Sequence, residues 1–72
     1  MELKYEIVKD VCVLNNDGKS TSKELKIIKW GNNEPTYDIR RWREGTPSKG
    51  ISLTQDEAVA LLEALKNELE QA

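Results

Sequence analysis

The chain has 72 residues, a formal net charge of −2, a single cysteine and no histidine. A chain this short forms one domain with a small core, and a lone cysteine excludes an internal disulfide framework and a cysteine-rich zinc site. Without histidine, the usual proton shuttle and the commonest metal ligand are both missing. We therefore expect a single domain over residues 1–72, with no cofactor, no metal and no enzymatic activity.

Apolar runs are too short to cross a bilayer, which needs roughly 20 residues, and the N-terminus has no signal-like apolar core. We expect a soluble cytoplasmic protein with no membrane partner. The charges are unevenly distributed, with a net charge of −2 over residues 1–18, +4 over residues 19–49 and −4 over residues 50–72. A basic middle next to an acidic tail is typical of a polyanion-binding surface, although ordinary solvated faces give the same pattern.

The first strand is predicted over residues 3–14, where apolar residues alternate with polar ones. Twelve residues is long for one strand, and the alternation lapses at Lys9, so we expect a bend or bulge near Lys9 and Asp10. A polar stretch over residues 15–22, which contains an Asp-Gly turn signal, is predicted as a surface loop.

The second and third strands are predicted over residues 24–30 and 37–43, joined as a hairpin by a turn rich in Gly, Asn and Pro. Strand alternation places one set of side chains on a shared face: Lys26, Ile28, Trp30, Asp38, Arg40 and Trp42. Exposed tryptophans bordered by cations are typical of proteins that stack the bases of single strands. The alternative is a half-buried Trp42 with the neighbouring Arg40 packed on its ring as a cation–π pair.

Residues 44–49 are predicted as a loop, and residues 50–53 as a short last strand that leads directly into a helix. Thr54 and Glu57 form a capping box, and the apolar periodicity extends the helix to about Glu70. We expect its apolar stripe both to cover one face of the sheet and to contact a second subunit, since a thin core gains buried area by pairing. The stripe consists of Ala58, Leu61, Leu62, Leu65 and Leu69.

Two blocks carry a resemblance to a known family: Asp38-Ile39-Arg40 on the third strand, and the segment from Lys49 to Thr54 that opens the helix. Over about residues 22–69 the sequence resembles the transcriptional positive cofactor four (PC4) family, and its short bacterial members most. The resemblance implies an α+β homodimer, in which each protomer has a curved four-stranded antiparallel sheet followed by one C-terminal helix. It also implies grooves for single-stranded DNA on the sheets and a dimer interface on the helices, formed by Leu61, Leu62, Leu65 and Leu69.

Carried over by position, the strand-three arginine of the family falls on Arg40, and the lysine before the fourth strand falls on Lys49. The aromatic residue that closes the second strand falls on Trp30. Two positions depart from the pattern. A basic residue of the family is replaced by Ile28, which cannot make an ionic contact, and the aromatic residue after the strand-three arginine is displaced by one position to Trp42.

Together, the residues and the resemblance favour a non-enzymatic, nucleoid-associated homodimer that binds single-stranded DNA, or RNA, with little sequence preference in transcription, replication or repair. Phosphates are predicted to contact basic side chains, and bases to contact aromatic and apolar ones. The alternative is a protein-interaction module that uses the same face, because Trp and Arg are enriched at the centres of protein interfaces. The predicted contact residues are Lys26, Ile28, Trp30, Arg40, Trp42, Arg43 and Lys49.

Overall fold

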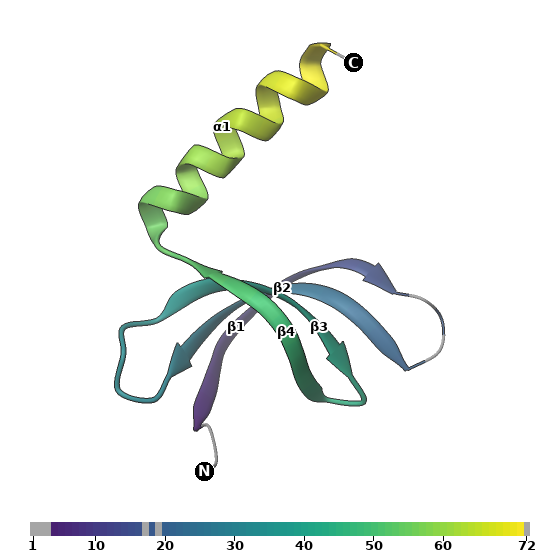
Figure 1. Ribbon diagram of the computed structural model, residues 1–72, viewed down its shortest axis with the longest axis vertical. Helices are drawn as coiled ribbons and strands as arrows, with labels where there is room; N and C mark the ends of the chain where they lie inside the picture. The colour runs from purple at the N-terminus through teal and green to yellow at the C-terminus, as the bar shows by residue number, and fades with distance from the viewer. Residues whose placement is uncertain (1–3, 17, 19, 72) are drawn as a thin grey trace.

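Four antiparallel strands in sequential order form one sheet, and a single helix follows it in the computed structural model (Figure 1). The structure describes residues 4–16, 18 and 20–71, so Leu3 and Asp17 of the predicted strand and turn lie outside the described residues. The α+β fold class expected from the sequence is confirmed. The elements are β1 (Tyr5–Asn16), β2 (Thr21–Trp30), β3 (Thr36–Arg43), β4 (Thr46–Leu53) and α1 (Gln55–Gln71).

The first strand is irregular along its whole length. Its register with β2 shifts at three points, between Ile7 and Lys9, between Asp10 and Cys12, and again near the end of the strand. The bulge predicted near Lys9 and Asp10 is therefore confirmed, and two more accompany it. Bulges bend a strand and increase its twist, and the strands curve into an arch with α1 on its outer side (Figure 1).

The pairing of β2 with β3 places the predicted set of side chains on one face. Lys26 lies opposite Asp38, and Ile28 lies opposite Thr36, which is the register that the alternation requires. We call this surface the aromatic face; its members on these strands are Lys26, Ile28, Trp30, Asp38, Arg40 and Trp42. Leu25 and Ile39 point to the other face and line a groove beneath α1, so the aromatic face lies on the inner side of the arch.

The predicted loop over residues 44–49 is wrong, because β4 already begins at Thr46. Only Glu44 and Gly45 separate β3 from β4, and both have positive φ, at 50° and 80°. Two such residues form a tight hairpin turn whose twist matches that of the strands. Pro47 lies within β4, where an edge strand tolerates the missing N–H.

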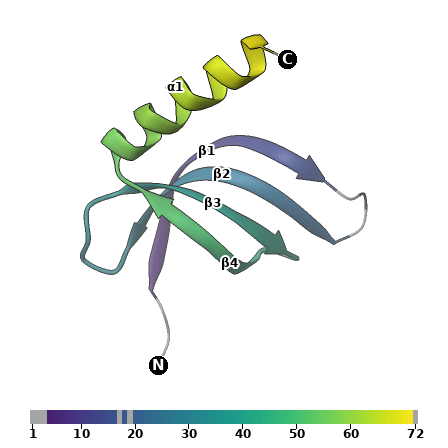
Figure 2. The same ribbon diagram turned by 45° about the horizontal axis from the view of Figure 1, so that its top comes forward.

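The capping box at the start of α1 is confirmed, since Glu57 N–H donates to Thr54 Oγ1 at 3.2 Å and Thr54 N–H donates to Glu57 Oε1 at 2.8 Å. The helix rises from the end of β4 and points away from the sheet (Figures 1 and 2), and no described residue of α1 is buried. The expectation that its apolar stripe covers the sheet is therefore wrong within one protomer. Between the helix and the sheet lies an open groove of about 340 Å³.

The core of the protomer is thin. In the described ranges the only buried apolar side chains are those of Ile28, at 0% exposure, and Trp42, at 5%. Both belong to the aromatic face, so packing against β1 on that face supplies the core that α1 does not. The helix α1 is not long and apolar enough to span a membrane.

Candidate nucleic-acid interface

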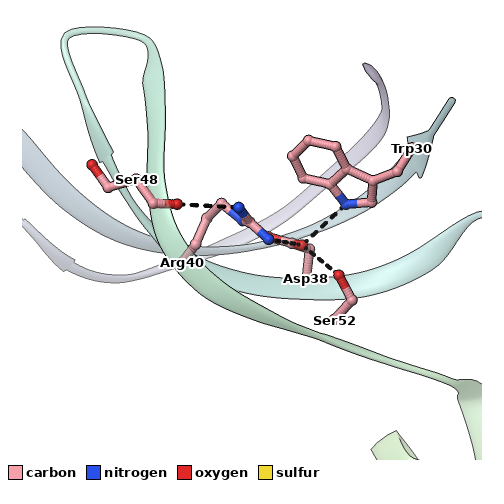
Figure 3. Close-up of polar contacts among 5 residues, drawn as sticks. All are labelled: Trp30, Asp38, Arg40, Ser48 and Ser52. Atoms are coloured by element: carbon pink, nitrogen blue, oxygen red, sulfur yellow. Dashed lines mark hydrogen bonds and ion pairs between the residues drawn. The ribbon is translucent and has the colours of Figure 1, made fainter. Parts of the chain in front are cut away.

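The centre of the aromatic face is Asp38, whose side chain is fully buried on β3. Its carboxylate forms an ion pair with Arg40, in which Arg40 Nη2 donates to Oδ2 at 2.8 Å and Arg40 Nε donates to Oδ1. Trp30 Nε1 and Ser52 Oγ donate to the same Oδ2 at 3.3 and 3.0 Å (Figure 3). A buried charge is stable only when it is paired and hydrogen-bonded, and here one carboxylate joins side chains of three strands.

Arg40 is also stacked on an aromatic ring, with its Cζ atom 4.6 Å from the centroid of Trp30. Its Nη1 donates to the carbonyl oxygen of Ser48 on β4 at 3.1 Å, which fixes the guanidinium from a second side (Figure 3). The interpretation in which Arg40 packs on Trp42 is therefore wrong. Arg40 makes its cation–π contact with the tryptophan of the neighbouring strand.

Three aromatic rings follow one another across the face. The Tyr5 ring on β1 lies 5.2 Å from Trp30 and 6.0 Å from Trp42, and both pairs are tilted. Tyr5 is exposed and pairs directly with Trp30 in the β1–β2 register. Tyr5 was not among the contact residues predicted from the sequence. A hairpin of the first two strands brings the start of β1 beside the end of β2, and this pairing could have indicated it.

Lys26 forms the second charged cluster of the face. Its ammonium forms ion pairs with Asp10 and, at 2.8 Å, with Glu24, and lies 5.0 Å from the centroid of the Trp42 ring. Burial alone lowers the pKa of Lys26, but its hydrogen bonds to the two carboxylates outweigh burial and raise that pKa above its ordinary value. The hydrogen bonds from Lys26 and Ser22 lower the pKa of Glu24. Glu24 and Lys26 therefore both stay charged at neutral pH.

Two predicted contact residues lie beneath this surface. Ile28 and Trp42 are the buried pair of the core, and Trp42 Nε1 has no hydrogen-bond partner among the described residues. The Trp42 ring contacts both Tyr5 and Lys26. In this structure the Trp42 ring has no free face for a base, whereas Trp30 is partly exposed.

The remaining predicted residues, Arg43 and Lys49, are exposed at the end of β3 and within β4. Neither forms an ion pair within the part of the chain that the structure describes. They do not join the Asp38 network, and their charges remain open to solvent. The basic side chains predicted as phosphate contacts thus divide into two that are neutralised within the sheet and two that are not.

Gly50 sets how closely β4 approaches Arg40. The two residues are partners in the β3–β4 register. A Cβ atom on Gly50 would overlap Cβ of Arg40 and the carbonyl oxygen of Ile39, and would lie 2.7 Å from Cα of Arg40. Since backbone atoms cannot move aside cheaply, only glycine fits at this position.

The family model of Transcriptional Coactivator p15 (PC4) matches residues 18–64, which are 47 of the 72 residues. The chain belongs to the PC4 family. PC4 proteins are DNA-binding transcription cofactors and are not known as enzymes. No curated protein matches the chain. The match to the PC4 family covers β2, β3, β4 and the first part of α1, and it leaves out the whole of β1, including Tyr5 and Asp10.

Proposed function

We propose that this PC4-family protein is a homodimer that binds single-stranded DNA on its aromatic face with little sequence preference. The observation that carries the proposal is the row of partly exposed rings, Tyr5 and Trp30, with the guanidinium of Arg40 stacked beside them. Aromatic rings and arginine planes both stack bases, and stacking accepts every base because each has a π-face. Ile28 and Trp42 support this surface from below.

Phosphate contacts in this proposal come mainly from the exposed cations Arg43 and Lys49. Lys26 and Arg40 already face three carboxylates on the same side of the sheet, those of Asp10, Glu24 and Asp38. Their first effect is therefore to hold the aromatic rings in place. A bound strand that lies with its bases on the rings keeps its phosphates outward, toward the exposed rim of the sheet.

The proposed homodimer rests on the surface that one protomer leaves uncovered. Its accessible surface is 5946 Å², whereas a folded monomer of 8.2 kDa exposes roughly 4,500 Å². The excess of about 1,400 Å² is within the range that each subunit of an obligate dimer buries. The leucines of α1 that remain exposed are Leu61, Leu62, Leu65 and Leu69, with Leu69 at 72%. We propose that a second copy of the chain covers them.

Binding of a fluorescent oligo-dT of about 20 nucleotides, measured by anisotropy at several salt concentrations, tests the proposal. If about 4–6 phosphates are neutralised, log K falls with log salt with a slope of roughly −3 to −4. We expect the single strand to bind more tightly than a duplex of equal length. Equal binding of the duplex, or binding that is insensitive to salt, would contradict the proposal.

If single-strand binding is contradicted in this way, the alternative function, a protein-interaction module, is favoured. In that case the Trp30 and Arg40 surface contacts an apolar protein site, and alanine at Lys49 has little effect. If the protein binds single strands, we propose that it is a cytoplasmic protein associated with nucleic acid. An RNA oligonucleotide of the same length, titrated in parallel, compares the two kinds of strand directly.

A further inference from the structure

The two carboxylates that hold Lys26 differ in how firmly they are held themselves. Glu24 lies on the same strand as Lys26, accepts a second hydrogen bond from Ser22, and has a side chain that is 19% exposed. Asp10 reaches Lys26 from β1, and its side chain is 74% exposed. Across the described residues, the Asp10 carboxylate forms no ion pair other than that with Lys26.

The backbone around Asp10 is also the least regular part of the sheet. Register shifts occur on both sides of it, between Ile7 and Lys9 and between Asp10 and Cys12, and β1 is an edge strand. Bulged edge strands are held by fewer ladder hydrogen bonds than regular central ones. The Asp10 carboxylate can therefore leave Lys26 without disturbing the β2–β3 pairing.

An open groove gives access to the same ammonium. The groove has a volume of about 250 Å³ on the aromatic face, and its lining includes Ile7, Ser22, Glu24, Lys26 and Trp42. If Asp10 moves out, Glu24 and the Trp42 ring still hold the ammonium at the edge of this groove. A phosphate oxygen has the charge and the hydrogen-bonding capacity of the carboxylate that it would replace.

We propose that Asp10 occupies a phosphate site at Lys26 and is displaced when a nucleic-acid strand binds. This inference rests on the proposed function and adds one phosphate contact to it, made by exchange of one anion for another. The exchange weakens binding, because the contact between Asp10 and Lys26 is lost as the new one forms. It also selects for ligands with a dense row of negative charges, since a neutral ligand cannot displace the carboxylate.

Asp10→Asn tests the exchange, because it removes the competing charge and keeps the shape of the side chain. We expect the Kd for an oligo-dT of about 20 nucleotides at low salt to fall by about three- to tenfold. We also expect the salt slope to become steeper, by at most about 0.7, since no freed carboxylate takes up a cation on binding. A purely structural role of Asp10 would not steepen the slope.

Glu6→Gln is the matched control, because Glu6 is an exposed carboxylate on the same strand and is not ion-paired in the described part of the chain. It changes the net charge equally, and we expect a smaller change in Kd and an unchanged slope. In a Lys26→Gln background, Asp10→Asn should no longer tighten binding. Circular dichroism and thermal unfolding establish that each variant is folded.

The inference is overturned if Asp10→Asn binds as the wild type does, or if Glu6→Gln tightens binding equally. Tightening that persists in the Lys26→Gln background would also overturn it, because the gain would then come from general charge. Absence of binding by the wild-type protein would instead overturn the proposed function, and the inference with it. The two failures are therefore distinguishable in one set of titrations.

Discussion

The guanidinium of Arg40 forms an ion pair with the buried Asp38 and at the same time lies over the ring of Trp30. The ion pair fixes the orientation of the guanidinium plane, and the guanidinium in turn packs against the Trp30 indole. Trp30 in turn donates to Asp38, so the three side chains hold one another in a single arrangement. Such a preformed surface lowers the ordering cost when a ligand binds.

Arg40→Ala should lower the free energy of unfolding by about 3 kcal/mol, because it leaves the buried carboxylate of Asp38 without its partner. Arg43→Ala is the control, since Arg43 is exposed and unpaired among the residues described, and we expect a change below about 0.5 kcal/mol. Urea unfolding followed by circular dichroism measures both. Equal stability of the two variants would show that the Asp38 network contributes little.

Gly50→Ala should also destabilise the protein, by about 1–3 kcal/mol, because the added methyl group overlaps atoms of Ile39 and Arg40. The shift of β4 that relieves this overlap moves Arg40, so we expect weaker oligonucleotide binding as well. Ser48→Ala adds no clash on the same strand and serves as the control. Unchanged thermal unfolding of Gly50→Ala would contradict the close approach of the two strands.

The Glu24–Lys26 pair predicts how stability changes with pH. The pKa of Glu24 is lowered by folding, so its contribution is present above its ordinary value of 4.5 and is lost as the pH falls below that value. The pKa of Lys26 is raised, so its contribution is present below the ordinary value of 10.5 and is lost as the pH rises above it.

Thermal unfolding of the wild type and of Glu24→Gln across this pH range measures the effect of the pair. The difference between the two melting temperatures should be largest near neutral pH and should shrink in acid, where Glu24 of the wild type becomes protonated. A difference that stays constant down to strongly acidic pH would show that the charge of Glu24 does not stabilise the fold.

Leu62→Glu should convert the proposed dimer to monomers, because it places a charge in the exposed apolar stripe of α1. Ala60→Glu introduces the same charge on the opposite side of the helix and should leave the dimer intact. Sedimentation velocity measures the mass of both variants. If the wild type itself sediments as a monomer of 8.2 kDa, the exposed leucines require another partner.

Much of the fold could be predicted from periodicity and helix signals. Alternation in β2 and β3 fixed which residues share a face, and Thr54 and Glu57 fixed the start of α1. The tight turn after β3 and the start of β4 were less predictable, because Glu44 is not a residue type that favours positive φ. The first half of β4 was also difficult to predict, because proline argues against a strand at Pro47 until the position of that strand at the edge of the sheet is known.

The sequence predicted which residues belong to the candidate site better than it predicted how they are arranged. Alternation assigns Trp30 and Trp42 to one face, but it does not show that Tyr5 and Lys26 cover one ring and leave the other partly exposed. Likewise, the spacing of Lys26 and Arg40 identifies two cations and does not reveal carboxylates from other positions. The contact of Asp10 with Lys26 depends on the pairing of β1 with β2, and the bulges of β1 make this register unreadable from the sequence.

Tryptophan fluorescence of Trp42→Phe, titrated with an oligo-dT of about 20 nucleotides, tests base stacking on the aromatic face most directly. The chain has two tryptophans, so this variant reports on Trp30 alone, while Trp30→Phe reports on the buried Trp42 as the control. We predict salt-sensitive quenching of Trp30, saturating at one strand per dimer, and little change for Trp42. Unchanged Trp30 emission up to tens of micromolar oligonucleotide would contradict single-strand binding on this face.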